Sequence, residues 1–438
     1  MPSCLTTWPS APSATSGRQR IPTPAWCPSL LQAGCQRSSA KVSLRFWAMG
    51  REGEVAQELL QGFRGEHPDW ELRIEQLPWS AAHEKFLTAF AGDATPDVAQ
   101  MGNTWLPEMA ALGALQPLAG RLAAATTVPQ ADYFEGLWRT NVIAGQLLGL
   151  PWTVDTRLLY YRADLLAQAG FSRAPQDWPQ WQAAMQALQQ RAGVATPQLF
   201  PLTEFEPLLA LALQAPGELV SAEGRAHFRG PAFRQALGFY LEAFRRGWAP
   251  AATHNQIANV WQEFDRGSIA FYISGPWNIA EFRRRLAADR QHIWAAAPLP
   301  GPQGPGASIA GGTSLVMFKR SRHPEAAWAL MEYLARPAVQ ARFFQLSGNL
   351  PPRRSVWELA GLQQDPAARA FAAQLERVRP TPALPEWERI AQEMQLTAAH
   401  LAYRGGSVDA ALAQLDQRVD ALLSKRRWML ARQAGSLP

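Results

Sequence analysis

Strand and helix signals alternate along the first patterned stretch of the chain, and this alternation limits the possible folds most strongly. Residues 42–47, 72–77 and 97–101 are short runs with the character of strands. Between them, residues 54–63 and 83–90 carry apolar side chains at helical spacing. The order strand–helix–strand–helix–strand predicts an α/β fold with a parallel or mixed sheet and helical crossovers.

The alternation continues towards the C-terminus. Further strands are expected at 146–151, 157–161, 268–274 and 313–318, and further helices at 162–169, 178–191, 324–334 and from 364 onward, with a helix-rich stretch at 206–266. Asp177 is the expected N-cap of the helix at 178–191. Residues 298–306 are dense in proline and glycine, which predicts a surface loop or a crossing between lobes.

The composition is that of a soluble globular protein, with 47% hydrophobic and 18% charged residues in 438. The net charge of +6 raises the question of nucleic acid, but the basic runs at 283–285 and 425–427 are short and lie in helix-like stretches. No stripe of basic and aromatic residues accompanies them, so we expect solvated helix faces and no nucleic-acid partner.

The N-terminal residues 1–41 show no helical or strand periodicity and are expected to form a signal or disordered segment. The run 30–35 resembles the end of a bacterial lipoprotein signal, which makes Cys35 the candidate for lipidation. A disordered tail with a chance match and a mis-assigned start are the two alternatives. After Cys35 the chain has no cysteine, and no run of 18 apolar residues occurs.

Enzyme motifs are mostly missing. The sequence has no GxSxG, no phosphate loop and no HExxH, and its seven histidines form no i, i+4 pair, so neither a metal nor a cofactor is expected. One enzymatic alternative is a glycoside hydrolase that pairs Asp155 with Glu204 or Glu206, since glycosidases use two carboxyl groups about 5–10 Å apart.

Several of the 18 tryptophans stand where a strand ends and a loop or helix begins. These are Trp47, Trp79, Trp105, Trp152 and Trp277. In open α/β sheets, ligands bind at the carboxyl ends of strands. Packing in the core is at least as good an explanation for any one of these side chains. For the whole set, binding of a sugar is the better interpretation, because sugar C–H faces stack on flat rings.

At these residues the sequence resembles the extracellular solute-binding proteins of bacterial sugar ABC importers, the family that includes maltose- and trehalose-binding proteins. The resemblance covers nearly all of 42–430, and its elements appear in family order. They are Leu44–Trp47, Thr95–Val98, Gly102–Trp105, Gly149–Tyr161, Phe271–Trp277, Gly311–Leu315 and Asn349–Arg353.

The resemblance implies a two-lobed periplasmic-binding-protein fold of type II, hinged by several chain crossings. The first lobe would comprise 42–150 and 309–348, and the second 151–308 and 349–433. The implied protein is a monomer without enzymatic activity, either periplasmic or lipid-anchored at the outer face of the inner membrane. It would bind a maltose-, maltooligosaccharide- or trehalose-type sugar by hinge closure and deliver it to permease subunits. A polyol or a glycerol phosphodiester is the alternative ligand within the family.

Ligand roles also follow from the resemblance. Glu54 and Asn103 would hydrogen-bond sugar hydroxyls, and Asp155 matches an acidic residue at the start of the second lobe. Trp277, with Trp47, Trp105 or Trp152, would stack on sugar rings. Backbone atoms of Gly311, Gly312 and Thr313 would approach the ligand, and Arg353 would donate hydrogen bonds from the last crossing.

Overall fold

The computed structural model describes residues 41–433, except for 124, 126 and 253–258. The candidate for lipidation, Cys35, lies outside the described residues. Among the described residues, no helix is both long enough and apolar enough to span a bilayer.

The first lobe is built on a five-stranded sheet with the order β2-β1-β3-β12-β6. Its strands are β1 (Ser43–Met49), β2 (Glu71–Leu77), β3 (Val98–Gly102), β6 (Leu150–Val154) and β12 (Gly312–Met317). β1 pairs in parallel with β2 and β3, whereas β12 runs antiparallel to both of its neighbours, β3 and β6. The sheet is therefore mixed, and a strand from late in the chain lies between two strands from its first half.

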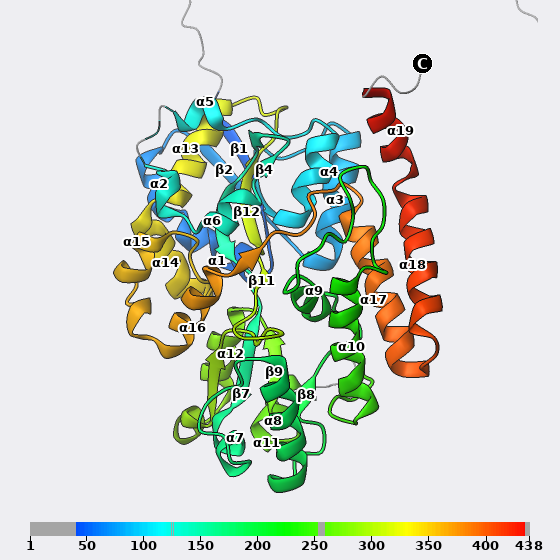
Figure 1. Ribbon diagram of the computed structural model, residues 1–438. Coiled ribbons are helices and arrows are strands. Elements are labelled where there is room, and N and C mark those ends of the chain that lie inside the picture. Colours follow the sequence, from blue (N-terminus) through cyan, green and yellow to red (C-terminus); the bar gives the residue numbers. More distant parts are fainter. Residues whose placement is uncertain (1–40, 124, 126, 253–258, 434–438) are drawn as a thin grey trace, which may run out of the picture. The chain divides into compact units, whose positions relative to one another are not determined.

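Helices cover both faces of this sheet (Figure 1). They are α1 (Gly50–Leu59), α2 (Gln61–Glu66), α3 (Trp79–Ala91), α4 (Leu106–Ala111), α5 (Ala119–Leu122), α6 (Glu135–Arg139), α13 (Pro324–Ala335) and α14 (Pro337–Ser347), with 3₁₀ turns η1 (Asn103–Trp105) and η2 (Gln130–Asp132) and the hairpin β4 (Val142–Ile143) and β5 (Gln146–Leu147). The predicted helix at 54–63 is longer and is interrupted at Leu60. The predicted helix at 83–90 begins earlier, at Trp79, because extended Pro78 precedes it.

The second lobe contains a four-stranded sheet with the order β10-β7-β9-β8. Its strands are β7 (Leu158–Arg162), β8 (Gln198–Leu199), β9 (Phe271–Ser274) and β10 (Trp294–Ala297). The helices of this part are α7 (Ala163–Gln168), α8 (Trp178–Arg191), α9 (Glu206–Ala212), α10 (Pro231–Arg245), α11 (Val260–Arg266), α12 (Trp277–Arg285) and the 3₁₀ turn η4 (Ala288–Ile293). The N-cap prediction is confirmed, since the Asp177 carboxylate accepts a hydrogen bond from the Gln180 backbone N–H at 2.8 Å.

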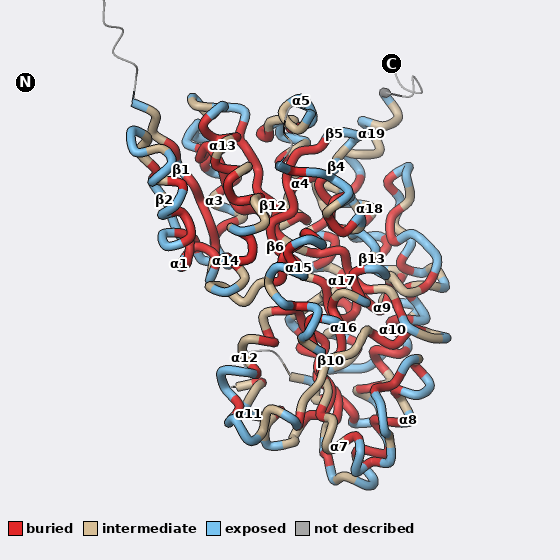
Figure 2. The backbone as a smooth tube through the Cα atoms, turned by 90° about the vertical axis from the view of Figure 1, so that its left-hand side faces the viewer, coloured by how far each residue is buried: buried red, intermediate tan, exposed pale blue. Residues whose placement is uncertain are grey.

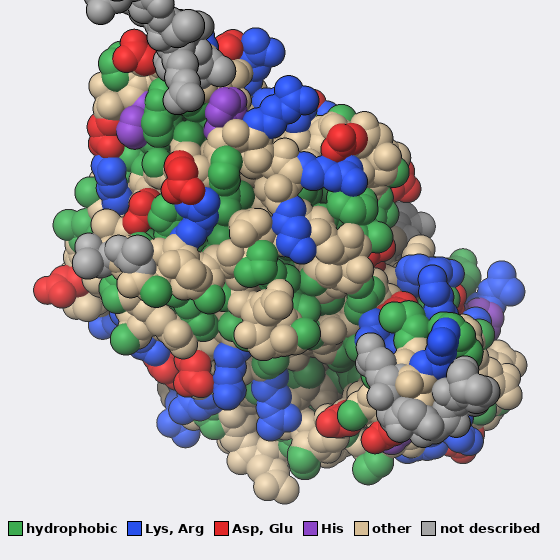
Figure 3. Space-filling model, turned by 90° about the horizontal axis from the view of Figure 1, so that it is seen from above, with side chains coloured by type: hydrophobic (Ala, Val, Ile, Leu, Met, Phe, Trp, Pro, Cys, Tyr) green, Lys and Arg blue, Asp and Glu red, His purple; other side chains and the backbone are tan. Residues whose placement is uncertain are grey.

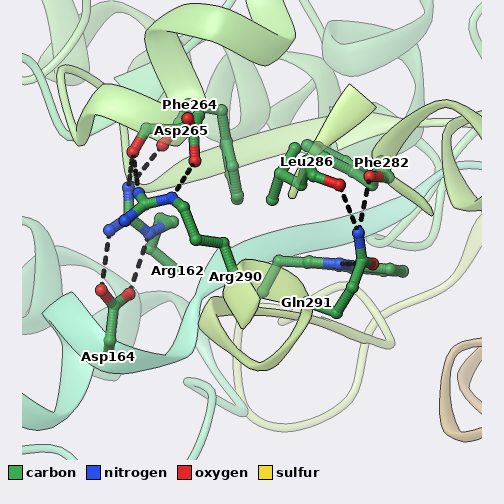
Figure 4. Close-up of polar contacts among 9 residues, drawn as sticks. Arg162, Asp164, Phe264, Asp265, Phe282, Leu286, Arg290 and Gln291 are labelled. Atoms are coloured by element: carbon green, nitrogen blue, oxygen red, sulfur yellow. Dashed lines mark hydrogen bonds and ion pairs between the residues drawn. The ribbon is translucent and has the colours of Figure 1, made fainter. Parts of the chain in front are cut away.

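A buried arginine ties the elements of this second sheet together (Figure 4). Arg162, the last residue of β7, donates to both carboxylate oxygens of Asp164 at 2.8 and 2.7 Å and to the backbone carbonyls of Phe264 and Asp265 at the end of α11. The Asp265 carboxylate in turn accepts from Arg290 of η4 at 2.6 Å. The guanidinium group thus donates four hydrogen bonds and pairs with a carboxylate, which offsets the cost of burying its charge.

Several chain segments pass between the two sheets. One joins β6 directly to β7, and another leads from the proline- and glycine-rich loop at 298–306 through β11 (Ser308–Ile309) into β12. β11 pairs in parallel with β13 (Val378–Arg379). Residues 151–154 belong to β6, which pairs within the first sheet. The lobe boundaries stay a prediction.

The C-terminal part of the chain is mostly helical, as the sequence predicts, but the predicted run of helix from 364 is interrupted by β13 and by the irregular residues 380–386. It comprises α15 (Arg354–Leu359), the 3₁₀ turn η5 (Leu362–Gln364), α16 (Pro366–Leu375), α17 (Trp387–Arg404), α18 (Val408–Leu422) and α19 (Ser424–Gln433). The inner face of α17 joins the core of the second lobe through Trp387, Ile390 and Met394. The central strands of both sheets and the inner helix faces are largely buried, whereas the edge strand β2 is partly exposed and β10 is half-buried (Figure 2). On the face shown in Figure 3, basic side chains are interspersed with acidic and apolar ones and form no continuous basic patch.

Candidate functional site

A cavity of about 510 Å³ opens where the two sheets face each other. On the first sheet, the pairing register places Gly102, Thr313 and Thr153 in one row across the edge. The residues that follow β1, β3 and β6 line the cavity at this edge. From the second lobe, residues at the starts of α9 and α12 complete the wall. The position agrees with the rule that ligands bind at the carboxyl ends of strands in open α/β sheets.

Most of the tryptophans and backbone positions that the sequence singled out meet in this cavity. The residues predicted to bind ligand that line it are Trp79, Asn103, Trp105, Asp155, Trp277, Gly311, Gly312 and Thr313. They come from both lobes, so a single ligand in the cavity can touch all of these segments. Their roles in binding stay a proposal.

Two predicted tryptophans lie in the core of the first lobe instead. Trp47 is 5% exposed and packs on Phe86, with ring centroids 5.5 Å apart. Trp152 is 1% exposed and stacks on Phe343 at 4.4 Å. Both stand near the ends of strands, as predicted, but their side chains point from the sheet into packed helices, away from the cavity.

Two predicted charged residues also lie elsewhere. Glu54 is exposed on the outer side of α1 and pairs with Arg51 at 2.9 Å. Arg353 is 3% exposed, and its guanidinium donates to the Asp132 carboxylate at 2.6 Å and to two backbone carbonyls. Through these contacts Arg353 holds the segment before α15 against the first lobe. They account for a buried arginine at this position without a ligand.

The aromatic wall of the cavity belongs to the first lobe. Trp79 is the first residue of α3 and remains 41% exposed, and its ring meets that of Trp105 edge to face at 5.8 Å. Gly50 has a φ of +51°, and a β-carbon there would lie 2.7 Å from Nε1 of Trp79. Glycine at position 50 therefore allows the Trp79 ring to lie across the end of β1.

The polar wall belongs to the second lobe and is organised by Arg157. Its guanidinium donates to Glu206 at 2.9 Å, lies 3.4 Å from Oδ1 of Asp155, and stands over the Trp277 ring at 4.8 Å. Nearby, a β-carbon at Gly275 would lie within 1.9 Å of the Trp277 ring. Arg157 thus fixes two carboxylates and one indole ring as a single unit facing the cavity.

Glycines 311 and 312 were predicted to let backbone approach a ligand. In the structure, a β-carbon at Gly311 would lie 2.1 Å from the carbonyl oxygen of Asp155, and one at Gly312 would lie 2.2 Å from that of Thr153. The chain itself therefore requires both glycines, because β6 and β12 approach each other closely at this edge. The next residue, Thr313, shares a hydrogen bond of 2.8 Å with the Thr153 hydroxyl.

Burial alters the proton affinity of two acidic groups that line the cavity, Glu52 and Asp155. Burial raises the pKa of Glu52 to about 7, although its own backbone N–H and the side chains of Gln100 and Asn349 favour the charged form. Burial also raises the pKa of Asp155, against the opposing effect of Arg157. The part of the Asp155 side chain that remains exposed faces the cavity, where a ligand can reach it.

Replacing Glu52 with glutamine is expected to stabilise the unliganded protein at high pH. The folded state binds the Glu52 proton more tightly than the unfolded chain, so this residue favours folding below pH 4.5 and loses that contribution as the pH rises through 7. The contribution of Glu52 to the free energy of unfolding falls by about 3 kcal/mol in total, because one pKa unit corresponds to about 1.36 kcal/mol. Urea unfolding at pH 5 and pH 8 should show a gain for Glu52→Gln that is larger at pH 8. An equal gain at both pH values would contradict the explanation.

Sequence reasoning missed several polar residues that line the cavity. They are Arg51, Glu52, Arg157, Asn349 and Glu388. Arg157 and Asn349 stand within motifs that the sequence had identified, so their neighbourhood was a usable signal. Glu206, considered only as a catalytic partner of Asp155, is also in the wall, whereas Glu204 is not among the lining residues.

The family model of the bacterial extracellular solute-binding proteins matches residues 58–370, which is most of the chain. The chain belongs to this family. The sugar-binding protein MalE of Xanthomonas citri, whose structure is known, is 50% identical to this solute-binding protein. The two superpose with a TM-score of 0.85 over 89% of this chain and 99% of MalE. The predicted fold, two α/β lobes of the periplasmic-binding-protein type, is confirmed.

More distant relatives extend the comparison. A binding protein of Brucella abortus is 25% identical over 86% of this chain and 91% of its own length. The maltodextrin-binding protein MdxE of Bacillus subtilis is also 25% identical, over 57% of this chain and 60% of its own.

Proposed function

We propose that this solute-binding protein is the substrate-binding component of a sugar ABC importer and takes a maltose-, maltooligosaccharide- or trehalose-type sugar. The observation that carries the proposal is the pairing of two walls across one cavity. Trp79 and Trp105 offer aromatic surface on the first lobe, and the unit of Asp155, Arg157 and Glu206 offers hydrogen-bonding groups on the second. An aromatic surface opposite charged acceptors suits a sugar, which has apolar faces and a rim of hydroxyls.

Binding proceeds by hinge closure in this proposal. The sugar stacks on the tryptophans of the first lobe, and its hydroxyls donate to the carboxylates of the second lobe as the lobes approach. Each hydroxyl bonded to a charged group contributes about 1.5–3 kcal/mol, and an analogue without that hydroxyl leaves the carboxylate unpaired. The relatives that bear the names MalE and maltodextrin-binding protein support the choice of sugar.

The proposed role includes no catalysis. Glycoside hydrolysis needs one carboxyl group that gives a proton and another that attacks or activates water. Arg157 instead pairs with both Asp155 and Glu206, and this shared cation holds the two carboxyl groups as acceptors for the hydroxyl groups of a ligand.

The protein acts outside the cytoplasm in this proposal, in keeping with the extracellular family. It works as a monomer in the periplasm, or is held at the membrane through Cys35, and permease subunits recognise its closed form.

Thermal unfolding against a panel of saccharides tests the function. A sugar at 100 times its Kd is expected to stabilise the protein by about 2.7 kcal/mol and to raise its Tm, because it binds the folded state alone. Maltose, maltotriose and trehalose should give the shift, and glycerol should not. A shift with a glycerol phosphodiester and none with any saccharide would favour the other ligand class. Release of glucose from maltotriose by the purified protein would overturn the claim that it has no activity.

A further inference from the structure

A carboxylate on the C-terminal helix α17 enters the same cavity from a third side. Glu388 stands in the first turn of α17 and lines the cavity together with Asp155 and Trp277, although more than a hundred residues separate it from Trp277 in sequence. Neighbouring Trp387, 1% exposed, and Ile390 anchor this turn in the core of the second lobe. The position of Glu388 is therefore fixed by packing.

Glu388 also reaches across to the first lobe. The start of α17 packs against η1, and the Thr104 side chain of η1 lies close enough to the Glu388 carboxyl group to favour its charged form. His83 and Glu108 of the first lobe and Glu206 of the second are the other ionisable groups close to it. His83 is itself held by Glu108 at 2.7 Å, so no cation among the described residues pairs directly with Glu388.

One oxygen of this carboxyl group has no partner. Oε1 of Glu388 is buried and accepts no hydrogen bond within the described part of the chain. Burial raises the pKa of Glu388, and its place at the N-terminus of an 18-residue helix opposes that effect by favouring the charge. A buried acceptor without a donor costs roughly 1–3 kcal/mol, and a donor supplied by a ligand removes the cost.

We propose that Glu388 is a ligand-binding residue whose Oε1 accepts a hydrogen bond from a hydroxyl group of the bound sugar. The inference rests on the proposed function and adds a third contact segment to it. With Trp79 and Trp105 on the first lobe and Asp155 on the second, a sugar would be held from α3, from the β6–β7 crossing and from α17. We expect Glu388 to raise the affinity for the sugar, since it is the side chain through which α17 lines the cavity.

Calorimetric titration of the full chain with maltotriose tests this inference. Glu388→Gln keeps the size of the side chain and removes the charge, and it should raise the Kd roughly 10- to 100-fold, the value of a hydrogen bond to a charged group. The matched control is Glu393→Gln on the same helix, where Arg418 pairs with the carboxylate at 2.7 Å away from the cavity. It should change the Kd less than twofold.

A second pair of variants separates contact with the sugar from contact with Thr104. In a Thr104→Val background, Glu388→Gln should still raise the Kd at least tenfold, and thermal unfolding without sugar should show each variant folded. If Glu388→Gln has no effect in that background, the carboxylate acts only through Thr104 and the inference is overturned. A second outcome would overturn the inference and leave the proposed function intact: the wild-type protein binds maltotriose, and the Kd of Glu388→Gln lies within threefold of the wild-type Kd. If the wild-type protein binds no saccharide, the proposed function fails first and the inference with it.

Discussion

Asp155→Ala is expected to abolish the rise in Tm that a sugar produces, while the protein stays folded. Asp155 is the one acidic group that lies at the crossing between the sheets, faces the cavity and touches Arg157. Its loss removes an acceptor for sugar hydroxyls and lets Arg157 turn fully towards Glu206. We expect the affinity for maltotriose to fall at least 100-fold, the upper range for a hydrogen bond to a charged group.

The fold should tolerate the change, because Asp155 contributes to the crossing through its backbone. Its N–H donates to the carbonyl of Gly311 at 2.8 Å, and this bond does not depend on the side chain. Asp177→Ala is the matched control. It removes an N-cap outside the cavity and should cost about 1 kcal/mol of stability while the sugar still raises the Tm. A normal sugar shift in Asp155→Ala would exclude this carboxylate from the site.

Gly311→Ala is expected to have the largest effect on stability. The added β-carbon would meet the carbonyl oxygen of Asp155 at 2.1 Å; its position is fixed by the backbone of residue 311, and the oxygen is itself a backbone atom, so neither can turn away. The strands β6 and β12 would have to separate next to the crossing. We expect the free energy of unfolding to fall by about 3 kcal/mol, as for other forced overpacking, and the Kd for maltotriose to rise because Asp155 moves with the strand.

Urea unfolding measures the first effect and calorimetry the second. Gly238→Ala is the control, since Gly238 lies on an exposed face inside α10 and a β-carbon there would meet nothing within 4 Å. That variant should gain roughly 0.5–1 kcal/mol from helix propensity. If Gly311→Ala retains wild-type stability, the close approach of the two strands does not explain the glycine.

Local patterns were sufficient for much of the fold. The alternation of strands and helices was read from side-chain periodicity, and the Asp177 cap depends only on a bond three residues away. Helix starts were less certain, because Trp79 begins a helix that apolar spacing alone would start later. The short strand β13 escaped notice, since two residues carry no periodicity and their partner β11 is far away in sequence.

The site shows where sequence reasoning ends. Trp47, Trp79 and Trp152 all stand near strand ends, yet only Trp79 reaches the cavity. The three tryptophans differ in the face of the sheet to which the side chain points and in the helix that packs on that face. These helices are distant in sequence, so local patterns do not reveal them. Arg353 had the chemistry of a ligand donor, but its partners Asp132 and the nearby carbonyls are contributed by other segments. Glu388 had no local signal at all.

The position of β12 has a consequence for the order in which the molecule can be made. This strand lies between β3 and β6 and pairs with both, yet it comes after the whole of the second sheet in the chain. A nascent chain that has emerged only as far as β10 holds two sets of strands that cannot yet join into the first sheet. Such long-range pairing is slow to form, and the pocket also needs Asn349 and Glu388 from still later in the chain. The ligand pocket therefore cannot be complete before nearly the whole chain has been made.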